Sequence, residues 1–387
     1  MRLAFVGCGY VADFYIKTLP YHPELELVGV YDWNPQRLAH FSNFYSVEVY
    51  DSLEALLTDD RVEIVVNLTN PESHYEVTKA SLMAGKHVYT EKPLALTFDE
   101  AEDLVELAKQ LGLYISSAPC SLYGDSAQTL WKALRHNIIG NVYLAYAELD
   151  DGMTHRLGYQ NWVSKSGTPW PYKNEFETGC TIEHAGYYLT WLTAFFGPAK
   201  VVTSFSSCLI PNKTKGVSPE AMAPDFSVGC IEFSSGIVAR ITCSIVAEVD
   251  RGLKIIGDEG TLSIKDCWNY RSPVYLEKRQ GRQSWIWKKI PILSRLLRDY
   301  AKPTYPLLSN PNRAHNQQNQ LDIMDYGYGI AELADAIQEN RPCRISADHA
   351  LHVTEITLSL QHPQEMGSPR KMKSTFTPIT PLPWAES

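Results

Sequence analysis

The sequence predicts an α/β protein of two domains: a doubly wound parallel sheet, followed by an α+β domain built on a largely antiparallel open sheet. Three observations predict this arrangement. The chain of 387 residues is too long for one ordinary core. Short β-branched runs alternate with helical spacing in the first third, and strand pairs joined by tight turns occupy the rest. We place the domains at residues 1–120 and 121–387.

The first domain is expected to hold five strands joined by helices. The apolar runs that predict strands lie at residues 3–7, 25–32, 62–68, 86–91 and 113–118. Segments of helical spacing separate them, most clearly over residues 99–112. Strands that alternate with helices in this way are typical of βαβ units, and therefore of a parallel sheet.

The pattern of apolar and polar residues changes in the second domain. A helix is expected at 126–135, a strand at 142–151 and a further helix at 180–192, after a loop rich in Gly, Pro and aromatic residues. The turns SSG and DEG interrupt the runs at 228–246 and 253–264, which favours antiparallel hairpins. Helical spacing returns at 323–340 and 347–361, and a Pro-rich tail ends the chain.

Composition excludes several classes of protein. A formal net charge of -9 gives no global electrostatic reason to bind nucleic acid. No segment holds eighteen uninterrupted apolar residues, and Met1 leads directly into a strand, so we expect a cytoplasmic protein. The eight cysteines form no CxxC pair, and His349 and His352 lack a carboxylate or Cys partner at ligand spacing. We therefore expect reduced thiols and no metal site.

The first turn carries a dinucleotide-binding pattern of the Rossmann type. It reads Gly7-Cys8-Gly9-Tyr10-Val11-Ala12 and lies between a strand and a helix. The first glycine permits the tight turn and the second lets the backbone approach a pyrophosphate. Asp32 ends the second strand, where a carboxylate can accept from the ribose 2′-hydroxyl and repel a 2′-phosphate. NAD is therefore the preferred cofactor, and nearby Arg37 keeps NADP possible.

A charged group follows the fourth strand. Glu91 and Lys92 stand at the carboxyl edge of the predicted sheet, where doubly wound folds bind ligands. Three motifs occur in order: Gly7-x-Gly9-x-x-Ala12, then Thr69-Asn70-Pro71-x-x-His74, then Glu91-Lys92-Pro93. In this combination the chain resembles the Gfo/Idh/MocA family over essentially its whole length.

The resemblance implies an NAD(P)-dependent oxidoreductase acting on a secondary alcohol or ketone of a sugar, a polyol or a nucleotide-linked sugar. It implies cofactor contacts from the motif residues, with Lys92 as the active lysine. It also implies a homodimer or homotetramer. The alternatives are an enzyme that cleaves glycosides through transient oxidation by NAD, and a non-catalytic NAD-binding regulator or scaffold. The residues that the resemblance adds as cofactor contacts are Thr69, Asn70, His74, Glu91 and Lys92.

The helix CTIEHAGYYLTWL offers two side-chain pairs at i, i+4 spacing: Glu183 with Tyr187, and His184 with Tyr188. Spacing alone leaves the choice open. The family resemblance places Glu183 at an Asp position and Tyr187 at the position of the acid/base. We therefore assign Tyr187 as the acid/base, Lys92 as its electrostatic partner, and Glu183 as the group that orients the substrate or Lys92. His184 stays a rival proton donor and a candidate substrate contact.

Two further segments carry aromatic residues. Trp162, Trp170 and Tyr172 precede the catalytic helix, where aromatic faces suit the C–H faces of a sugar ring. Packing against the sheet or another subunit is an equal alternative for them. Residues 278–300 interleave cations with Trp and Leu, a composition that suits peripheral contact with an anionic membrane or a diphosphate. The alternative is an insertion at a subunit contact.

Overall fold

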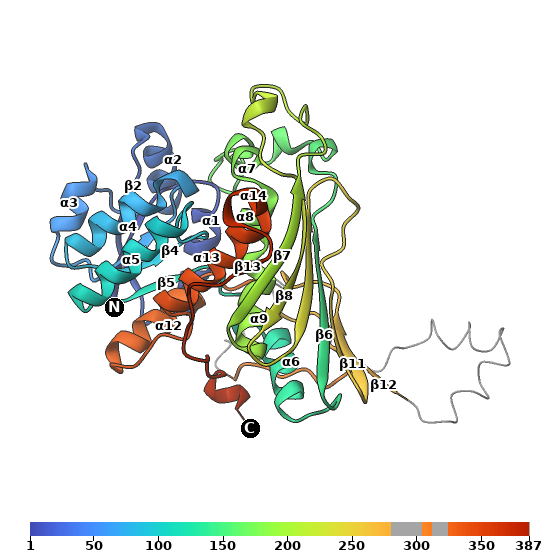
Figure 1. The fold of residues 1–387 in the computed structure, drawn as a ribbon. Helices are drawn as coiled ribbons and strands as arrows, with labels where there is room; N and C mark the ends of the chain where they lie inside the picture. Colours follow the sequence, from blue (N-terminus) through green and yellow to red (C-terminus); the bar gives the residue numbers. More distant parts are fainter. Residues whose placement is uncertain (280–303, 312–323, 387) are drawn as a thin grey trace.

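The computed structural model describes residues 1–279, 304–311 and 324–386 and shows two sheets with helices between them (Figure 1). The first sheet is parallel, in the order β2-β1-β3-β4-β5. Its strands are β1 (Arg2–Val6), β2 (Glu26–Tyr31), β3 (Ile64–Asn67), β4 (His87–Thr90) and β5 (Ile115–Ser117). The predicted doubly wound sheet is confirmed.

Helices cover both faces of this sheet because its strands are apolar on both sides. In β1, Leu3 and Phe5 belong to a core shared with α1 and α12, whereas Ala4 and Val6 face α3 and α4. The helices of this domain are α1 (Ala12–Thr18), α2 (Pro35–Tyr45), α3 (Leu53–Thr58), α4 (His74–Met83) and α5 (Phe98–Leu111). α12 (Gly327–Gln338) returns from the C-terminal half, so the sequence segment 121–387 contributes to both cores.

The second sheet has eight strands in the order β12-β11-β10-β6-β9-β8-β7-β13. Neighbours pair antiparallel except β6 and β9, which are parallel, so the predicted largely antiparallel open sheet is confirmed. The strands are β6 (Val142–Asp150), β7 (Ala199–Ser207), β8 (Phe226–Phe233), β9 (Val238–Ser244), β10 (Leu253–Gly257), β11 (Gly260–Ile264), β12 (Tyr275–Lys278) and β13 (Arg370–Lys371).

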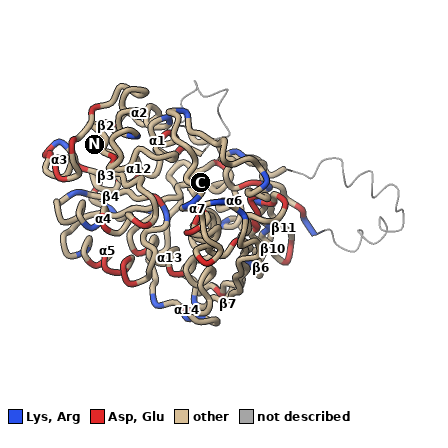
Figure 2. The backbone as a smooth tube through the Cα atoms, turned by 90° about the horizontal axis from the view of Figure 1, so that it is seen from above, with Lys and Arg blue, Asp and Glu red and all other residues tan. Residues whose placement is uncertain are grey.

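Helices cover one face of the second sheet and separate it from the first domain (Figure 1). They are α6 (Asp125–Arg135), α7 (Tyr172–Thr178), α8 (Cys180–His184), α9 (Gly186–Phe196), α13 (Ala347–Gln361) and α14 (Pro363–Met366). The helix expected at 180–192 is thus two consecutive helices that meet at Ala185. Basic and acidic residues are mixed over both domains (Figure 2).

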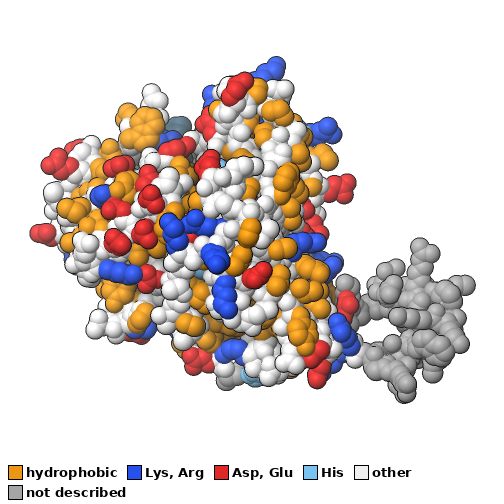
Figure 3. All heavy atoms as spheres, in the orientation of Figure 1, with side chains coloured by type: hydrophobic (Ala, Val, Ile, Leu, Met, Phe, Trp, Pro, Cys, Tyr) orange, Lys and Arg blue, Asp and Glu red, His pale blue; other side chains and the backbone are white. Residues whose placement is uncertain are grey.

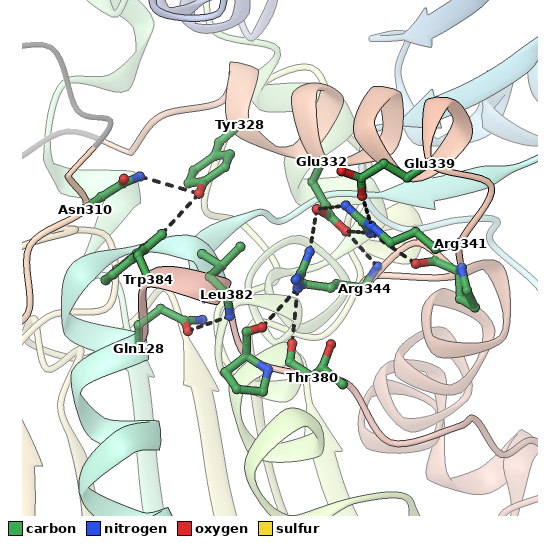
Figure 4. A network of polar contacts seen from close by, with 12 residues as sticks. Gln128, Asn310, Tyr328, Glu332, Glu339, Arg341, Arg344, Thr380, Leu382 and Trp384 are labelled. Carbon is green, nitrogen blue, oxygen red and sulfur yellow. Dashed lines mark hydrogen bonds and ion pairs between the residues drawn. The ribbon is translucent and has the colours of Figure 1, made fainter. Parts of the chain in front are cut away.

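The Pro-rich tail fastens α12 to the second domain (Figure 4). Arg344 donates to the carbonyls of Thr380 and Pro381 at 3.2 Å and to the buried carboxylate of Glu332 at 2.7 Å. The amide of Leu382 donates to Gln128 of α6 at 3.2 Å. The tail therefore links the helix that covers the first sheet to a helix that covers the second.

Two histidines of α13 are core residues. His349 is 1% exposed, and its Nε2 lies 2.8 Å from the Thr193 hydroxyl. His352 accepts from the amide of Ala199 at 2.9 Å. Burial lowers the pKa of His349 to about 3 and that of His352 to about 4. Both rings therefore stay neutral in the folded protein.

We expect the loss of folding stability caused by His349→Gln, compared with the wild type, to become smaller as the pH falls. The unfolded chain takes up a proton at this histidine near pH 6.5 while the folded chain does not, so the wild type loses stability below that pH. The free energy of unfolding of His349→Gln, relative to the wild type, should rise by about 1 kcal/mol for each pH unit between 6.5 and 4. Urea unfolding at several pH values measures it, with surface His136→Gln as control. A difference independent of pH would contradict it.

Candidate active site

A cavity of about 520 Å³ opens between the carboxyl ends of the first sheet and the second domain. From the first domain it is lined by Gly9, Tyr10, Val11, Phe14, Leu68, Thr69, Asn70, Pro71, His74, Glu91 and Lys92. From residues 151–326 it is lined chiefly by Asp151, Trp162, Trp170, Glu175, Glu183, His184, Tyr187, Arg251, Trp268 and Tyr326.

The glycine turn after β1 leaves room for a ligand on one side only. Gly7 has a φ of +103°, and a Cβ there would lie 2.6 Å from the backbone of Leu68. A Cβ on Gly9 would meet nothing within 4 Å, because Gly9 faces the cavity. Ala12 is fully buried in the first turn of α1. Gly7 and Ala12 therefore position the turn, and Gly9, Tyr10 and Val11 face the cavity.

Asp32 lies at the end of β2, as predicted, but its carboxylate is already engaged. It accepts from the amides of Cys8 and Asn34, both at 2.8 Å. Arg37 of α2 also donates to both of its oxygens, at 2.7 and 2.8 Å, and covers it so that 1% of the side chain is exposed. A ribose hydroxyl would therefore meet the Asp32–Arg37 pair, not a free carboxylate.

We expect replacement of Arg37 by Ala to increase the preference for NAD over NADP. The substitution frees the oxygens of Asp32 for ribose hydroxyls and removes the cation that could pair with a 2′-phosphate. The value of kcat/KM with NADP should fall by about tenfold to 100-fold, and that with NAD by less than about threefold. Steady-state kinetics with both cofactors measures it. Arg61→Ala, which breaks a surface pair with Asp59, is the matched control. An equal loss with both cofactors would contradict the expectation.

Lys92 follows β4 and meets the second domain. Its ammonium forms an ion pair with Glu183 of α8, and the side chains are 19% and 8% exposed. Burial alone would lower the pKa of Lys92, but Glu183, Glu91 and Glu175 outweigh it and raise the pKa above its usual value. Glu91 accepts from the Tyr15 hydroxyl at 2.7 Å and from the Lys92 amide at 3.2 Å. Lys92 is therefore protonated, and the ion pair with Glu183 fixes its ammonium at the cavity.

The entry to α8 positions Glu183. Gly179 has a φ of +101°, and a Cβ there would lie 2.6 Å from the amide oxygen of Gln361. Gln361 of α13 donates to the Thr178 carbonyl at 2.6 Å and accepts from the Ile182 amide at 3.1 Å. This buried side chain therefore holds the start of α8, one turn before Glu183.

Tyr187 faces the same cavity from α9, with its ring edge-on to Trp268 at 5.5 Å between ring centroids. Burial, followed by the charge of Glu91, raises the pKa of Tyr187 well above its usual value. Tyr187 is therefore a protonated phenol in this state, and so a proton donor.

His184 lies beside a group of carboxylates deeper in the second domain. Its Nε2 is 3.6 Å from Glu175 and 3.9 Å from Asp151, and its Nδ1 is buried without a hydrogen-bond partner among the described residues. Burial, Lys92 and Arg251 lower the pKa of His184 to about 3. Burial also raises the pKa of Asp151 to about 6. A neutral imidazole of this kind is a poor proton donor near neutral pH.

The aromatic loop divides between the cavity and the core. Trp162 and Trp170 line the cavity, with ring centroids 5.0 Å apart. Tyr172 does not line it and packs on Tyr159 instead, at 5.1 Å between centroids. The substrate contact expected of Tyr172 stays a prediction.

The loop is also fastened to the first domain. The backbone amide and hydroxyl of Ser166 donate to the buried carboxylate of Asp13 at 2.8 and 2.7 Å. Asn70 donates to Asn174 of α7 at 2.9 Å. These contacts hold the aromatic loop across the start of α1, where the dinucleotide turn lies.

His74 has a structural position. It is fully buried at the start of α4, and its ring nitrogens lie 2.6 Å from the Pro93 carbonyl and 3.0 Å from the Thr69 carbonyl. Burial lowers the pKa of His74. The ring therefore lies between the Thr69–Asn70 turn and the turn that carries Lys92, and a neutral imidazole can donate to only one of the two carbonyls at a time.

The cavity residues that were not predicted from the sequence include Asp151, Glu175, Arg251, Trp268 and Tyr326. Asp151 directly follows β6. Its position at the end of a strand was the one sequence feature that could have indicated a place in the cavity. The others come from connecting segments or from a short helix, and tertiary folding alone brings them to the cavity.

Comparison with known proteins identifies two separate parts of the chain. Residues 1–118 match the model of an oxidoreductase family with an NAD-binding Rossmann fold, GFO_IDH_MocA, and residues 127–263 match that of the GFO/IDH/MocA C-terminal domain. The chain belongs to the Gfo/Idh/MocA family. It is an NAD(P)-dependent oxidoreductase, and the glycine turn and cavity fit the dinucleotide of this family.

Relatives in the Gfo/Idh/MocA family are distant in sequence. An uncharacterised oxidoreductase from Synechocystis is 26% identical over 273 residues, 68% of this chain and 71% of that protein. Trans-1,2-dihydrobenzene-1,2-diol dehydrogenase from Bos taurus is 23% identical over 275 residues, 70% and 76% of the two chains. The WlbA dehydrogenase from Bordetella pertussis, solved with NADH and UDP-GlcNAcA, has a TM-score of 0.70 at 15% identity, covering 96% and 97%. The similarity to the WlbA structure shows that the two proteins share a fold.

Other sequence expectations concern features away from the Gfo/Idh/MocA cavity. All eight cysteines are free thiols. The described residues contain no cluster of three or more His, Cys, Asp or Glu side chains suited to a metal ion. In the same part of the chain, no helix has the length and apolar character needed to span a membrane. Of the basic aromatic segment 278–300, residues 280–300 lie outside the described residues.

Proposed function

We propose that this oxidoreductase transfers a hydride between NAD(P) and a secondary alcohol or ketone of a sugar or polyol, with Tyr187 as acid/base. The observation that carries the proposal is the meeting of Lys92 and Glu183 from different domains at the cavity that Tyr187 also lines. The cavity is continuous from the glycine turn to the second domain, so a dinucleotide and a substrate can share it.

Each of the three residues has a distinct proposed role. A nicotinamide cofactor held beside Gly9, Tyr10 and Val11 would supply or accept the hydride. The Tyr187 hydroxyl donates a proton to the carbonyl oxygen during reduction, and its raised pKa keeps that proton available. The Lys92 ammonium stabilises negative charge on the reacting oxygen. Glu183 holds Lys92 in place and keeps it charged, because the ion pair opposes the effect of burial on the pKa of Lys92.

A turnover screen tests the proposal. The purified protein is incubated with NAD or NADP and a panel of free sugars, inositols and simple glycosides, and net formation of reduced nicotinamide is followed by absorbance. Net reduction with at least one polyol supports the proposal. Cleavage of a glycoside without net reduction would favour the alternative of transient oxidation. Tight cofactor binding without turnover across the panel would favour a non-catalytic regulator.

We also propose a homodimer or homotetramer that pairs through the open face of the second sheet. That face carries Phe205, which is 57% exposed, together with the outward side chains of Val228, Tyr146 and Arg240 on neighbouring strands. Hydrophobic side chains also run along the C-terminal domain in Figure 3. Light scattering on the purified chain gives its mass in solution, and a monomer would contradict the proposal.

A further inference from the structure

The described cations of the cavity are both neutralised by carboxylates. Lys92 is paired with Glu183. Arg251 lies 3.3 Å from Asp151 and 3.4 Å from Asp266, and its guanidinium is 4.2 Å from the centroid of Trp268. An anionic substrate needs a cation or a set of free donors to replace its hydration. Among the described lining residues both cations are paired, although Nε of Arg251 has no hydrogen-bond acceptor there. The carboxyl groups of Glu91, Asp151, Glu175 and Glu183 outnumber these two cations, so an anionic substrate would meet a net acidic cavity.

The inner part of the cavity suits hydroxyl groups without charge. Glu175 and Asp151 flank His184 there, and Glu183 lies beside Lys92. Burial and neighbouring Glu183 raise the pKa of Glu175 well above its usual value, so this carboxyl can donate as well as accept a hydrogen bond. Carboxyl, carboxylate and imidazole groups together match the alternating donors and acceptors of a polyol.

The outer part of the cavity is apolar and partly open. Leu157 and Val249 line it while 53% and 58% exposed. A Cβ on Gly152 would lie 3.5 Å from Leu157 and 3.1 Å from Val249, so the two side chains flank one point of the backbone. Exposed apolar side chains beside a polar cavity gain free energy when a ligand covers them. They therefore suit an apolar part of the substrate.

We propose that the substrate is an uncharged sugar or polyol ring that carries an apolar substituent, of the aryl or alkyl glycoside class, and not a nucleotide diphosphate sugar. The ring occupies the acidic inner part beside Tyr187, and the substituent rests on Leu157 and Val249. This inference rests on the proposed hydride-transfer function, which it narrows to one substrate class.

Calorimetry and kinetics with matched compounds test the inference. The NAD-saturated protein is titrated with free hexoses, their phenyl glycosides, their UDP derivatives and phenyl glucuronide, and turnover of each is measured separately. Burial of a phenyl group should make the best phenyl glycoside bind at least about tenfold more tightly than its free hexose. The corresponding UDP-hexose and phenyl glucuronide should bind at least about tenfold more weakly than the phenyl glycoside, because their charges face carboxylates.

A surface variant locates the substituent. The double variant Leu157→Ser/Val249→Ser should lower kcat/KM for the phenyl glycoside by about tenfold and that for the free hexose by less than about twofold. Leu209→Ser is the matched control, since Leu209 is 56% exposed and does not line the cavity. An equal loss on both substrates would overturn the placement of the substituent.

The outcomes separate the inference from the function on which it rests. Turnover with tightest binding of a UDP-hexose or the glucuronide would overturn the inference and keep the proposed oxidoreduction. Selective binding of phenyl glycosides without turnover of any compound would overturn the proposed function and keep the binding preference. Equal affinity for free hexoses and phenyl glycosides would overturn the inference.

Discussion

Replacing Tyr187 by Phe is expected to lower kcat by about 10²-fold to 10⁴-fold, the usual effect of losing a general acid/base. The substitution removes only the hydroxyl, and the ring can keep its edge contact with Trp268. The pKa of Tyr187 is raised by burial, so the proton is present for ketone reduction across the neutral range. Initial rates of reduction and oxidation, measured with saturating cofactor, give the loss in each direction.

Two further variants make this expectation specific. Tyr143→Phe removes an exposed phenol on β6 that does not line the cavity, and it should leave turnover unchanged. His184→Ala removes the rival proton donor, and because the low pKa of His184 keeps its ring neutral, turnover should stay within about tenfold of the wild type. If Tyr187→Phe kept near-normal turnover while His184→Ala lost most of it, the role of acid/base would belong to His184 and not to Tyr187.

The cofactor side of the cavity could be predicted from the sequence because its residues are local. Gly7, Gly9 and Ala12 lie within one turn between a strand and a helix, and hydrophobic periodicity alone locates that turn. Lys92 was found for a similar reason, since the carboxyl end of a parallel strand faces the ligand edge of the sheet. Local sequence therefore carries the information for these positions.

The substrate side could be predicted only in part. Glu183 and Tyr187 were found through spacing and resemblance, but the expected single helix breaks into α8 and α9 at Ala185. Arg251 and Trp268 lie on connections beyond β9 and β11, where no periodic pattern exists. Arg37 was predicted as a neighbour of Asp32, yet the sequence could not show that it occupies both carboxylate oxygens. Such pairings depend on side-chain rotamers that tertiary contacts set.

Replacing Lys92 by Met is expected to have two effects that arise from different physics. The carboxylate of Glu183 loses its partner while 8% of its side chain is exposed, and breaking a buried pair in this way costs about 3–5 kcal/mol of the free energy of unfolding. Turnover should fall by about 10²-fold to 10³-fold, because the cation that stabilises charge on the reacting oxygen is gone. Urea unfolding and steady-state kinetics measure the two effects separately.

The double variant Lys92→Met/Glu183→Gln decides whether Lys92 acts in catalysis or only holds the domains together. Removing the unpaired charge of Glu183 should restore most of the lost stability, since an amide in that position no longer buries an ion. Turnover should stay as low as in Lys92→Met, because no cation remains beside the reacting oxygen. If turnover returned together with stability, the ion pair would be a structural link between the two domains, and the electrostatic role proposed for Lys92 would be wrong.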